Sequence, residues 1–389
     1  MQRFSFFLRL PVILALSHTY VAMRLAAAAP AGPGRWLAAS TLLLTYVLIL
    51  GGFFSRRSVG RPAGDAMAWI GFLFLGLFSW LFVLTLLRDM LLLAAAAVNA
   101  AGGGLTGAPA YAALHSASAI AVPVLGLAAV LLGLVNARRR ARVVDIEVRI
   151  DDLPLALQGL TIVQISDLHV GPTIKRAYVA AIVDAVNRLS PDVIALTGDL
   201  VDGSVARLGE HTQPLARLQA RHGVYAVTGN HEYYSGAEQW VAEFRRLGLR
   251  VLMNEHQVLA RQGVEFVVAG VTDFGAGGFS AAQASDPAQA LSGAPASAAV
   301  RILLAHQPRS APAGAAAGFD LQLSGHTHGG QFWPWQYFVP LQQPFVAGLH
   351  RQGRMQVYVS RGAGYWGPPM RIGARSEISR IRLTGAGPA

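Results

Sequence analysis

Long apolar runs dominate the first third of the chain and predict its organisation. Three of them hold no charged side chain: Trp36–Phe54, Ala66–Leu87 and Ala117–Asn136. Each is about 20 residues long, the length of an α-helix that crosses the hydrocarbon core of a bilayer. A fourth run, Phe4–Met23, contains Arg9 and His18, and its alternative interpretation is a cleaved signal peptide. We therefore expect a transmembrane region over residues 1–137 with about four helices.

Arginines that flank these runs predict the orientation, because Lys and Arg in short loops stay on the cytoplasmic side. Two clusters stand out: Arg56, Arg57 and Arg61, and then Arg138, Arg139, Arg140 and Arg142. Two helices separate the clusters, so both can be cytoplasmic, with residues 99–111 as the outer loop. We expect a multi-pass protein of the cell (inner) membrane whose second half is cytoplasmic. The runs hold few polar residues and no ionisable pair, which favours anchoring over transport.

After the apolar region the pattern changes to short β-branched runs separated by longer helical segments. The predicted strands are Leu160–Ser166, Val193–Thr197, Val224–Thr228, Val267–Val271, Val300–Ala305, Leu321–Ser324 and Val357–Ser360. Apolar spacing predicts helices over Lys175–Leu189 and Ala237–Leu247. Residues 138–150 are expected to be a basic juxtamembrane linker, and residues 151–385 a layered α/β domain.

Metal-ligand side chains follow five of the predicted strands, where ligands gather in α/β folds. They stand in five short blocks: Asp167 and His169; Asp199 and Asp202; Asn230, His231 and Glu232; His306; His326 and His328. Singly, each block is weak, since a histidine after a strand is often structural and Gly-Asn-His can be only a turn. Five blocks in order, each at a strand end, favour one shared metal site.

Charge and cysteine content narrow the function classes. Eleven of the 32 basic residues but only two of the 21 acidic residues lie in the first 140, so most of the net charge of +11 belongs to the apolar part. A nucleic-acid-binding protein would carry that excess on its soluble part, so a nucleic-acid partner is not expected. The chain has no Cys, which excludes thiolate metal sites and cysteine nucleophiles.

The five blocks resemble the calcineurin-like metallophosphoesterase superfamily, whose pattern is DxH, GDxxD, GNH(E/D), a later His, and GHxH. The resemblance covers residues of about 160 to 330, and the extension Gly325–Gln331 is similar in particular to the membrane-associated bacterial branch. It implies a β-sandwich flanked by helices and two metal ions. One ion would be held by Asp167, His169 and His328, the other by Asn230, His306 and His326, with Asp199 bridging both. His231 would donate a proton to the leaving group, steadied by Asp202.

The donor chemistry agrees with that implication. Imidazole, carboxylate and amide ligands without thiolate suit Mn, Fe or Zn, and two ions can clamp the attacking and leaving oxygens of a displacement. Asp202 would fix the tautomer of His231; alternatively it is a turn residue beside Gly203. Arg361, after the last predicted strand, is either a phosphate-binding residue or a solvated structural one. Glu232 is expected to support the site without ligating.

An aromatic segment follows the last block, with Phe332, Trp333, Trp335, Tyr337, Phe338 and Phe345. It is either a loop packed on the domain core or an interfacial surface. The sequence therefore predicts a membrane-anchored phosphohydrolase that cleaves a phosphodiester or pyrophosphate bond, with a lipid-linked substrate as its more specific form. The alternatives are a phosphomonoesterase or nucleotide phosphodiesterase acting on a soluble substrate, and a non-catalytic membrane scaffold or sensor. The oligomeric state cannot be derived from the pattern.

Overall fold

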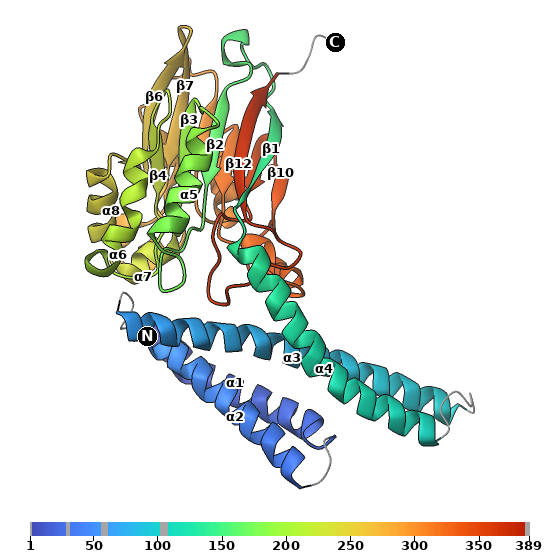
Figure 1. Ribbon diagram of the computed structural model, residues 1–389. Helices are drawn as coiled ribbons and strands as arrows, with labels where there is room; N and C mark the ends of the chain where they lie inside the picture. The colour runs from blue at the N-terminus through green and yellow to red at the C-terminus, as the bar shows by residue number, and fades with distance from the viewer. Residues whose placement is uncertain (1, 29–31, 56–60, 102–107, 386–389) are drawn as a thin grey trace. The chain divides into compact units, whose positions relative to one another are not determined.

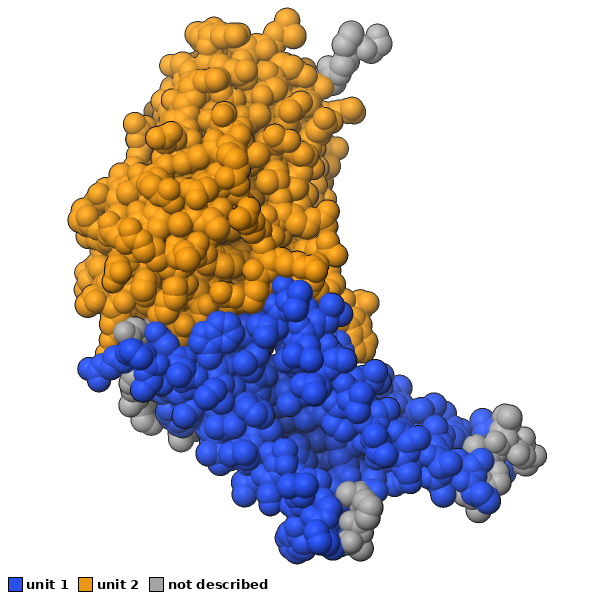
Figure 2. Space-filling view, viewed as in Figure 1, with its two compact units in different colours: residues 1–135, 367–370 blue, residues 136–366, 371–389 orange. Residues whose placement is uncertain are grey.

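A computed structural model describes residues 2–28, 32–55, 61–101 and 108–385 (Figure 1). It divides into two compact units, drawn in two colours in Figure 2. Unit 1 comprises residues 1–135 with 367–370, and unit 2 comprises residues 136–366 with 371–389. Arg56, Arg57 and part of the expected outer loop lie outside the described residues, whereas Arg61 and the second arginine cluster are described.

Unit 1 consists of long helices at the four places where the apolar runs predict them. They are α1 (Gln2–Leu25), α2 (Pro33–Phe54), α3 (Pro62–Ala100) and α4 (Ala108–Arg138), whose last residues belong to unit 2. Three are long and apolar enough to cross a membrane: Pro33–Phe54, Pro62–Ala100 and Pro109–Arg138. The weaker run forms the helix α1 but is not among these three in the part of the chain that the structure describes.

Packing within unit 1 is close on one side of the helices and open on the other. A side chain at Gly71 would place its Cβ only 2.5 Å from the Cα of Gly52, the small-residue contact that lets membrane helices approach. Leu14, Ile49, Phe78 and Val122, one from each helix, share a buried cluster. Large apolar residues such as Leu93 and Ile120 are exposed, as expected of side chains that face lipid.

Helix α3 continues past the predicted uncharged run, and the added residues bring an ionisable pair into unit 1. Directly after the run that ends at Leu87, Arg88 is buried and its Nη1 lies 3.5 Å from Oδ1 of Asp89. On α1, Arg24 pairs with Asp89 at 2.7 Å and the Tyr20 hydroxyl donates to it, also at 2.7 Å. Arg88 donates to Ser118 Oγ on α4 at 3.1 Å. The charges lie just past the uncharged run, and their mutual pairing makes burial in the helices tolerable.

Unit 2 contains two six-stranded sheets. The first has the order β1-β12-β2-β3-β4-β5 and the second β10-β11-β9-β8-β7-β6. The first sheet consists of β1 (Arg142–Arg149), β12 (Glu377–Thr384), β2 (Thr161–Ile165), β3 (Val193–Thr197), β4 (Val224–Val227) and β5 (Arg250–Val251). The second consists of β10 (Gly348–Gln352), β11 (Met355–Val359), β9 (Leu321–Ser324), β8 (Arg301–Leu304), β7 (Val264–Gly270) and β6 (Glu255–Arg261). Neighbouring strands β2, β3, β4 and β5 run parallel, as do β7, β8, β9 and β11.

The main apolar core lies between the two sheets. It joins Ile162 and Tyr225 of the first sheet to Phe266, Ile302 and Leu323 of the second, all at most 1% exposed. Helices flank the sheets: α5 (Arg176–Asn187), α6 (Val205–Thr212) and α8 (Ala237–Arg246) lie beside the first sheet (Figure 1), and α9 (Pro287–Leu291) and α10 (Ala311–Ala317) pack against the second. The short helix α7 (Asn230–Ser235) lies at the strand ends, directly after β4. The fold is therefore a β-sandwich flanked by helices, which confirms the predicted fold class.

Every predicted strand and both predicted helices of this unit are present, but five strands are additional. Among them, β1 lies inside residues 138–150, the expected linker, and pairs in parallel with β12 over its whole length, from Arg142 with Glu377 to Arg149 with Thr384. Its alternation of apolar and charged residues is typical of an edge strand with one exposed face. Residues 142–149 therefore belong to the sheet.

Candidate metal centre

The five sequence blocks meet at the carboxyl ends of β2, β3, β4, β8 and β9. Their backbone is unusual, because Asp167, His169, Asp199, His326 and His328 all have φ between 51° and 72°. Within the described residues, ten residues other than glycine have positive φ, and these are five of them. Such backbone is costly for L-residues and clusters at functional sites. The sheets therefore hold these side chains in positions that local propensity alone would not select.

Asp167, His169 and His328 form the first group of candidate ligands. The Nε2 atoms of His169 and His328 are 3.0 Å apart. Oδ1 of Asp167 lies 4.0 Å from His169 Nε2 and 3.5 Å from His328 Nε2. All three residues are buried, and their ligand atoms lie within 4.8 Å of one another. One cation at the centre of this group could be coordinated by all three.

Asp199, His306 and His326 form the second group. Nε2 of His306 lies 3.1 Å from Asp199 Oδ2 and 3.2 Å from Nδ1 of His326. The Asn230 amide oxygen is buried and has no hydrogen-bond partner among the described residues. A buried amide oxygen without a donor needs a compensating partner, and a cation held by the second group would supply one. The residues present therefore fit a second ion.

Asp199 lies between the two groups. Its Oδ2 is 3.9 Å from Nε2 of His169, in the first group, and 3.9 Å from Nε2 of His231. Its other oxygen, Oδ1, accepts the backbone N–H of His231 at 2.8 Å. Asp199 is thus the residue whose carboxylate is placed to contact cations in both positions.

Asp202 orients two histidines at once. Its Oδ1 lies 2.5 Å from Nδ1 of His231 and 3.2 Å from Nδ1 of His169. Both rings then present Nε2 to the interior of the site, the arrangement in which a carboxylate fixes the tautomer of a histidine. His306 is held in the same way by the carbonyl oxygen of Thr197, 2.7 Å from its Nδ1. The turn interpretation of Asp202 does not account for these contacts.

Glu232 supports the site from behind. Its carboxylate accepts backbone N–H groups of Gly229 at 2.6 Å, Leu200 at 2.7 Å and Asp199 at 3.0 Å. It thereby joins the loops that follow β3 and β4. Burial and the neighbouring Asp199 carboxylate raise the pKa of Glu232 to about 7, against the N–H donors of Gly229 and Leu200 and the charge on His306. Its bonds to three backbone groups agree with a supporting role.

Without metal, neighbouring side chains of the site have pKa values shifted in opposite directions. Burial disfavours a charged ring at His306, but the Asp199 carboxylate outweighs it and raises the pKa of His306 to about 10. Burial and the charge on His306 lower the pKa of His326 to about 3. Against its own burial, Asp202 has its pKa lowered by His169 and His231. Bound cations would take over the charge compensation that the protonated rings provide to the carboxylates.

Two further features of the candidate site involve residues outside the five sequence blocks. Arg371 is completely buried and donates to the carbonyl oxygen of His328 at 3.0 Å, with its Nη2 3.1 Å from that ring's Nδ1. The rings of Tyr234 and Trp366, both partly exposed, lie 5.3 and 5.6 Å from the ring of His231. Tyr234 lies two residues after the block that ends at Glu232, whereas Trp366 and Arg371 follow none of the five blocks and are brought to the site by the folded loops.

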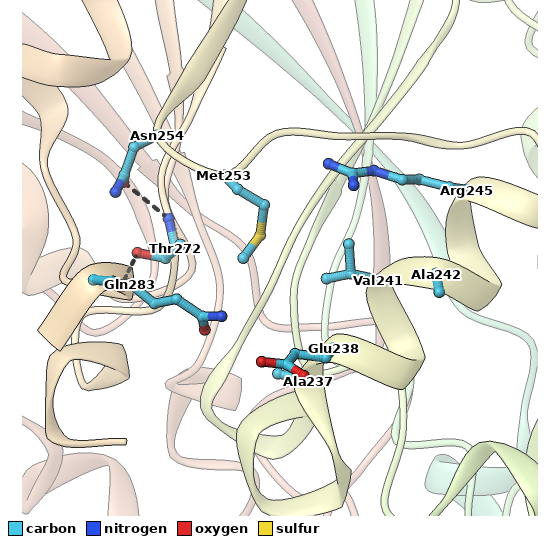
Figure 3. A pocket seen from close by; sticks show the side chains of 10 residues that line it. Ala237, Glu238, Val241, Ala242, Arg245, Met253, Asn254, Thr272 and Gln283 are labelled. Atoms are coloured by element: carbon cyan, nitrogen blue, oxygen red, sulfur yellow. Dashed lines mark hydrogen bonds between the residues drawn. The ribbon is translucent and has the colours of Figure 1, made fainter. Parts of the chain in front are cut away.

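A separate pocket of about 380 Å³ lies between α8 and the loops around Asn254, Thr272 and Gln283 (Figure 3). Glu238 and Arg245 of α8 contribute its polar wall. None of the nine predicted site residues lines it. The chemistry described above therefore resides at the strand ends and not in this pocket.

The fold and the donor set define a metal-dependent phosphoesterase domain, and the comparisons agree. The model of the family described as calcineurin-like phosphoesterase matches residues 160–330. A transmembrane protein with metallophosphoesterase domain from Danio rerio is 40% identical over 259 residues, covering 64% of this chain and 59% of the relative. An uncharacterized metallophosphoesterase from Campylobacter jejuni is 35% identical over 268 residues, covering 67% of this chain and 68% of the relative. An uncharacterized metallophosphoesterase from Aquifex aeolicus is 33% identical over 249 residues, covering 63% of this chain and 93% of the relative.

This chain belongs to the calcineurin-like metallophosphoesterase family. The match spans only about three-fifths of the vertebrate relatives, at 59% and 60% of their lengths. The relatives come from vertebrates as well as bacteria, so the likeness is broader than the bacterial branch suggested by the motif. Together with the three apolar helices, the transmembrane relatives identify the chain as a membrane protein.

Proposed function

We propose that this chain is a membrane-anchored phosphohydrolase that uses two divalent metal ions to cleave a phosphodiester or pyrophosphate bond. The observation that carries the proposal is the convergence of two ligand groups on one shared carboxylate, Asp199. Asp167, His169 and His328 would hold one ion, and Asn230, His306 and His326 the other. Bound there, Mn, Fe or Zn ions would neutralise phosphoryl charge and supply a hydroxide nucleophile from water.

His231 is the proposed proton donor to the leaving group. Its backbone is tied to Asp199 and its Nδ1 to Asp202, so Nε2 is the nitrogen left to face a substrate. A donor at that nitrogen lies beside the shared carboxylate, 3.9 Å from Asp199 Oδ2. Asp202 would keep the ring orientated as the proton leaves and stabilise its protonated form.

Two observations favour a lipid-linked substrate. Three apolar helices are long enough to cross a membrane, and such an anchor would keep the catalytic domain at the bilayer, where a lipid-linked substrate lies. The partly exposed rings of Tyr234 and Trp366 lie beside His231 and offer an apolar surface there. A phospholipid or a nucleotide-activated glycolipid would fit these neighbours. The arginine clusters favour a catalytic domain on the cytoplasmic face of a multi-pass inner-membrane protein.

Hydrolysis by the full chain in detergent micelles tests the proposal. Bis(para-nitrophenyl) phosphate is the diester substrate, with added Mn²⁺ or with chelator. We expect metal-dependent turnover that falls about a hundredfold or more in His231→Ala, the usual contribution of a general acid. Asp199→Asn should lose activity together with bound metal. His350→Ala is the matched control, because the His350 ring stacks on Phe345 and its Nε2 lies 3.0 Å from the Ala347 carbonyl oxygen, and His350 belongs to neither ligand group.

Diester turnover that survives in both His231→Ala and Asp199→Asn would contradict the proposal. Faster turnover of the monoester para-nitrophenyl phosphate than of the diester would favour the phosphomonoesterase alternative. Two tightly bound metal ions without turnover of either ester would favour the scaffold alternative.

A further inference from the structure

Arg361 is held beside the candidate metal centre by a buried carboxylate. It follows β11, and its backbone N–H donates to Oε1 of Glu377 at 3.1 Å while its Nη1 donates to Oε2 at 3.1 Å. Glu377, only 2% exposed, also accepts the hydroxyl of Tyr358 at 2.8 Å and that of Ser379 at 3.3 Å. One carboxylate therefore fixes both the backbone and the guanidinium of Arg361.

The loop around Arg361 is tied to the first ligand group. Ala363 N–H donates to the carbonyl oxygen of Ser166 at 2.8 Å, and Gly364 N–H to that of Asp167 at 2.9 Å. A side chain on Gly362 would come within 2.8 Å of the Cβ of Asp167. The residue next to Arg361 thus lies directly against a candidate ligand.

The aliphatic part of the Arg361 side chain also lies over Gly329, the residue after the candidate ligand His328. A side chain on Gly329, the residue after His328, would meet Cγ of Arg361 at 3.0 Å and its Cδ at 3.4 Å. Gly329 has φ of 60° and no side chain, so the arginine can lie over the backbone at this point. Arg361 is therefore enclosed between the segments that carry Asp167 and His328.

Glu377 uses only part of the guanidinium. Within the described residues, Nε and Nη2 of Arg361 make no hydrogen bond and neither is buried, and the side chain is 37% exposed. Arg371 offers a contrast, because its donors are spent on backbone carbonyls such as Gly364 O and on His328, and it is fully buried. Arg361 presents an open donor edge next to the ligands, and Arg371 does not.

We infer that Arg361 binds a non-bridging phosphoryl oxygen of the substrate and that Glu377 is its positioning residue. The inference rests on the proposed function and names a residue that recognises the oxyanion. A guanidinium can give two parallel N–H donors to a phosphoryl group. Because Glu377 already fixes Nη1, little side-chain entropy remains to be lost on binding.

Inorganic phosphate is the probe, since it presents the same oxygens without a leaving group. With the full chain in detergent and Mn²⁺, Arg361→Met should raise the Ki for phosphate and the KM for the aryl diester by about tenfold to a hundredfold, the range for a charged hydrogen bond. Arg361→Lys should recover part of the loss, since it keeps the charge without the fork. Glu377→Gln should raise KM more than it lowers kcat.

Three controls make the result specific. Mn content, measured by inductively coupled plasma mass spectrometry, should equal that of the unmodified chain in every variant. Arg351→Met should leave Ki and KM unchanged. Arg351 is an exposed arginine on β10, and its guanidinium lies 3.9 Å from the Asp151 carboxylate. Loss of metal in both Arg361→Lys and Arg361→Met, or unchanged Ki in the metal-loaded Met variant, would overturn the inference.

Failure of the proposed function would look different. If the metal-loaded chain hydrolyses no ester, phosphate binding measured by calorimetry still decides the role of Arg361. Weaker phosphate binding in Arg361→Met than in Arg351→Met would support it, and equal binding would refute it.

Discussion

Gly229→Ala should disable the candidate centre through one added methyl group. Gly229 precedes the candidate ligand Asn230 and has φ of −101°, a conformation that alanine adopts freely. Any effect must therefore come from steric clashes of the added methyl group with its neighbours. An added Cβ would lie 2.2 Å from Oδ1 and 2.5 Å from the backbone nitrogen of Asp199.

The required displacement is large for a metal site. An ordinary contact begins at 3.4 Å, so Asp199 or the loop that carries Gly229 must move by about 1 Å, a misplacement that can cost about a hundredfold in rate. The strain of forcing the methyl group into a packed site adds about 1 to 3 kcal/mol of destabilisation. We expect kcat for the aryl diester to fall about a hundredfold, with fewer than two metal ions retained per chain.

The assay combines diester turnover, metal content by mass spectrometry and thermal unfolding. Gly278→Ala is the matched control, because a Cβ there meets nothing within 4 Å and its φ is not positive. It should match the unmodified chain in all three measurements. A Gly229→Ala protein with two metal ions and normal kcat would show that Asp199 tolerates this displacement, which would refute the argument for a fixed bridging carboxylate.

Three further outcomes follow from charges in the structure. Because the pKa of His306 is raised to about 10 without metal, a bound metal ion must displace a proton from the His306 ring. Calorimetry should therefore show that Mn²⁺ affinity rises about tenfold per pH unit between pH 6 and 8. An affinity that does not depend on pH would contradict this. The pKa of Asp202 is lowered in the folded state, so its ionised form stabilises the fold at pH values above the ordinary Asp pKa of about 4. The melting temperature of the metal-free chain should therefore fall as the pH drops from 5 toward 3, and Asp202→Asn should remove that fall. An unchanged fall in the variant would refute this role of Asp202. Asp89→Asn leaves the buried Arg88 without its carboxylate and should destabilise the helices by about 3 to 5 kcal/mol, measured by thermal unfolding in detergent. A melting temperature equal to that of the unmodified chain would refute the role of the pair.

The strand-end chemistry could be predicted from sequence because each block combines a buried β-run with polar residues at its carboxyl end. In the structure the ligand atoms of Asp167, His169 and His328 are brought together as that pattern predicts. Their assignment as ligands remains a proposal. The strand β1 was not expected, because a run of arginines precedes it and charges alternate along it, a pattern equally typical of a solvated linker.

Contacts that depend on distant segments could not be predicted at all. Glu377 lies in a strand without any motif, and only the pairing of β12 beside β2 brings it to Arg361. The Arg88 and Asp89 pair lies outside the predicted segment, because the uncharged run stops at Leu87 although α3 continues to Ala100. A composition rule ends a membrane segment at the first charge, whereas a helix can continue when neighbouring helices supply partners.

The position of β12 has a consequence for biogenesis. β1 and β2 follow each other in the sequence but do not pair; β12, made last among the strands, inserts between them. While the nascent chain is being translated, β1 has no partner and β2 has an open edge, which is a hazard for aggregation. The helices leave the ribosome first and can already be in the bilayer. Because β12 also carries Glu377, Arg361 is clamped beside the candidate metal ligands only when translation has passed that strand, so the candidate site would be completed as the last step of folding.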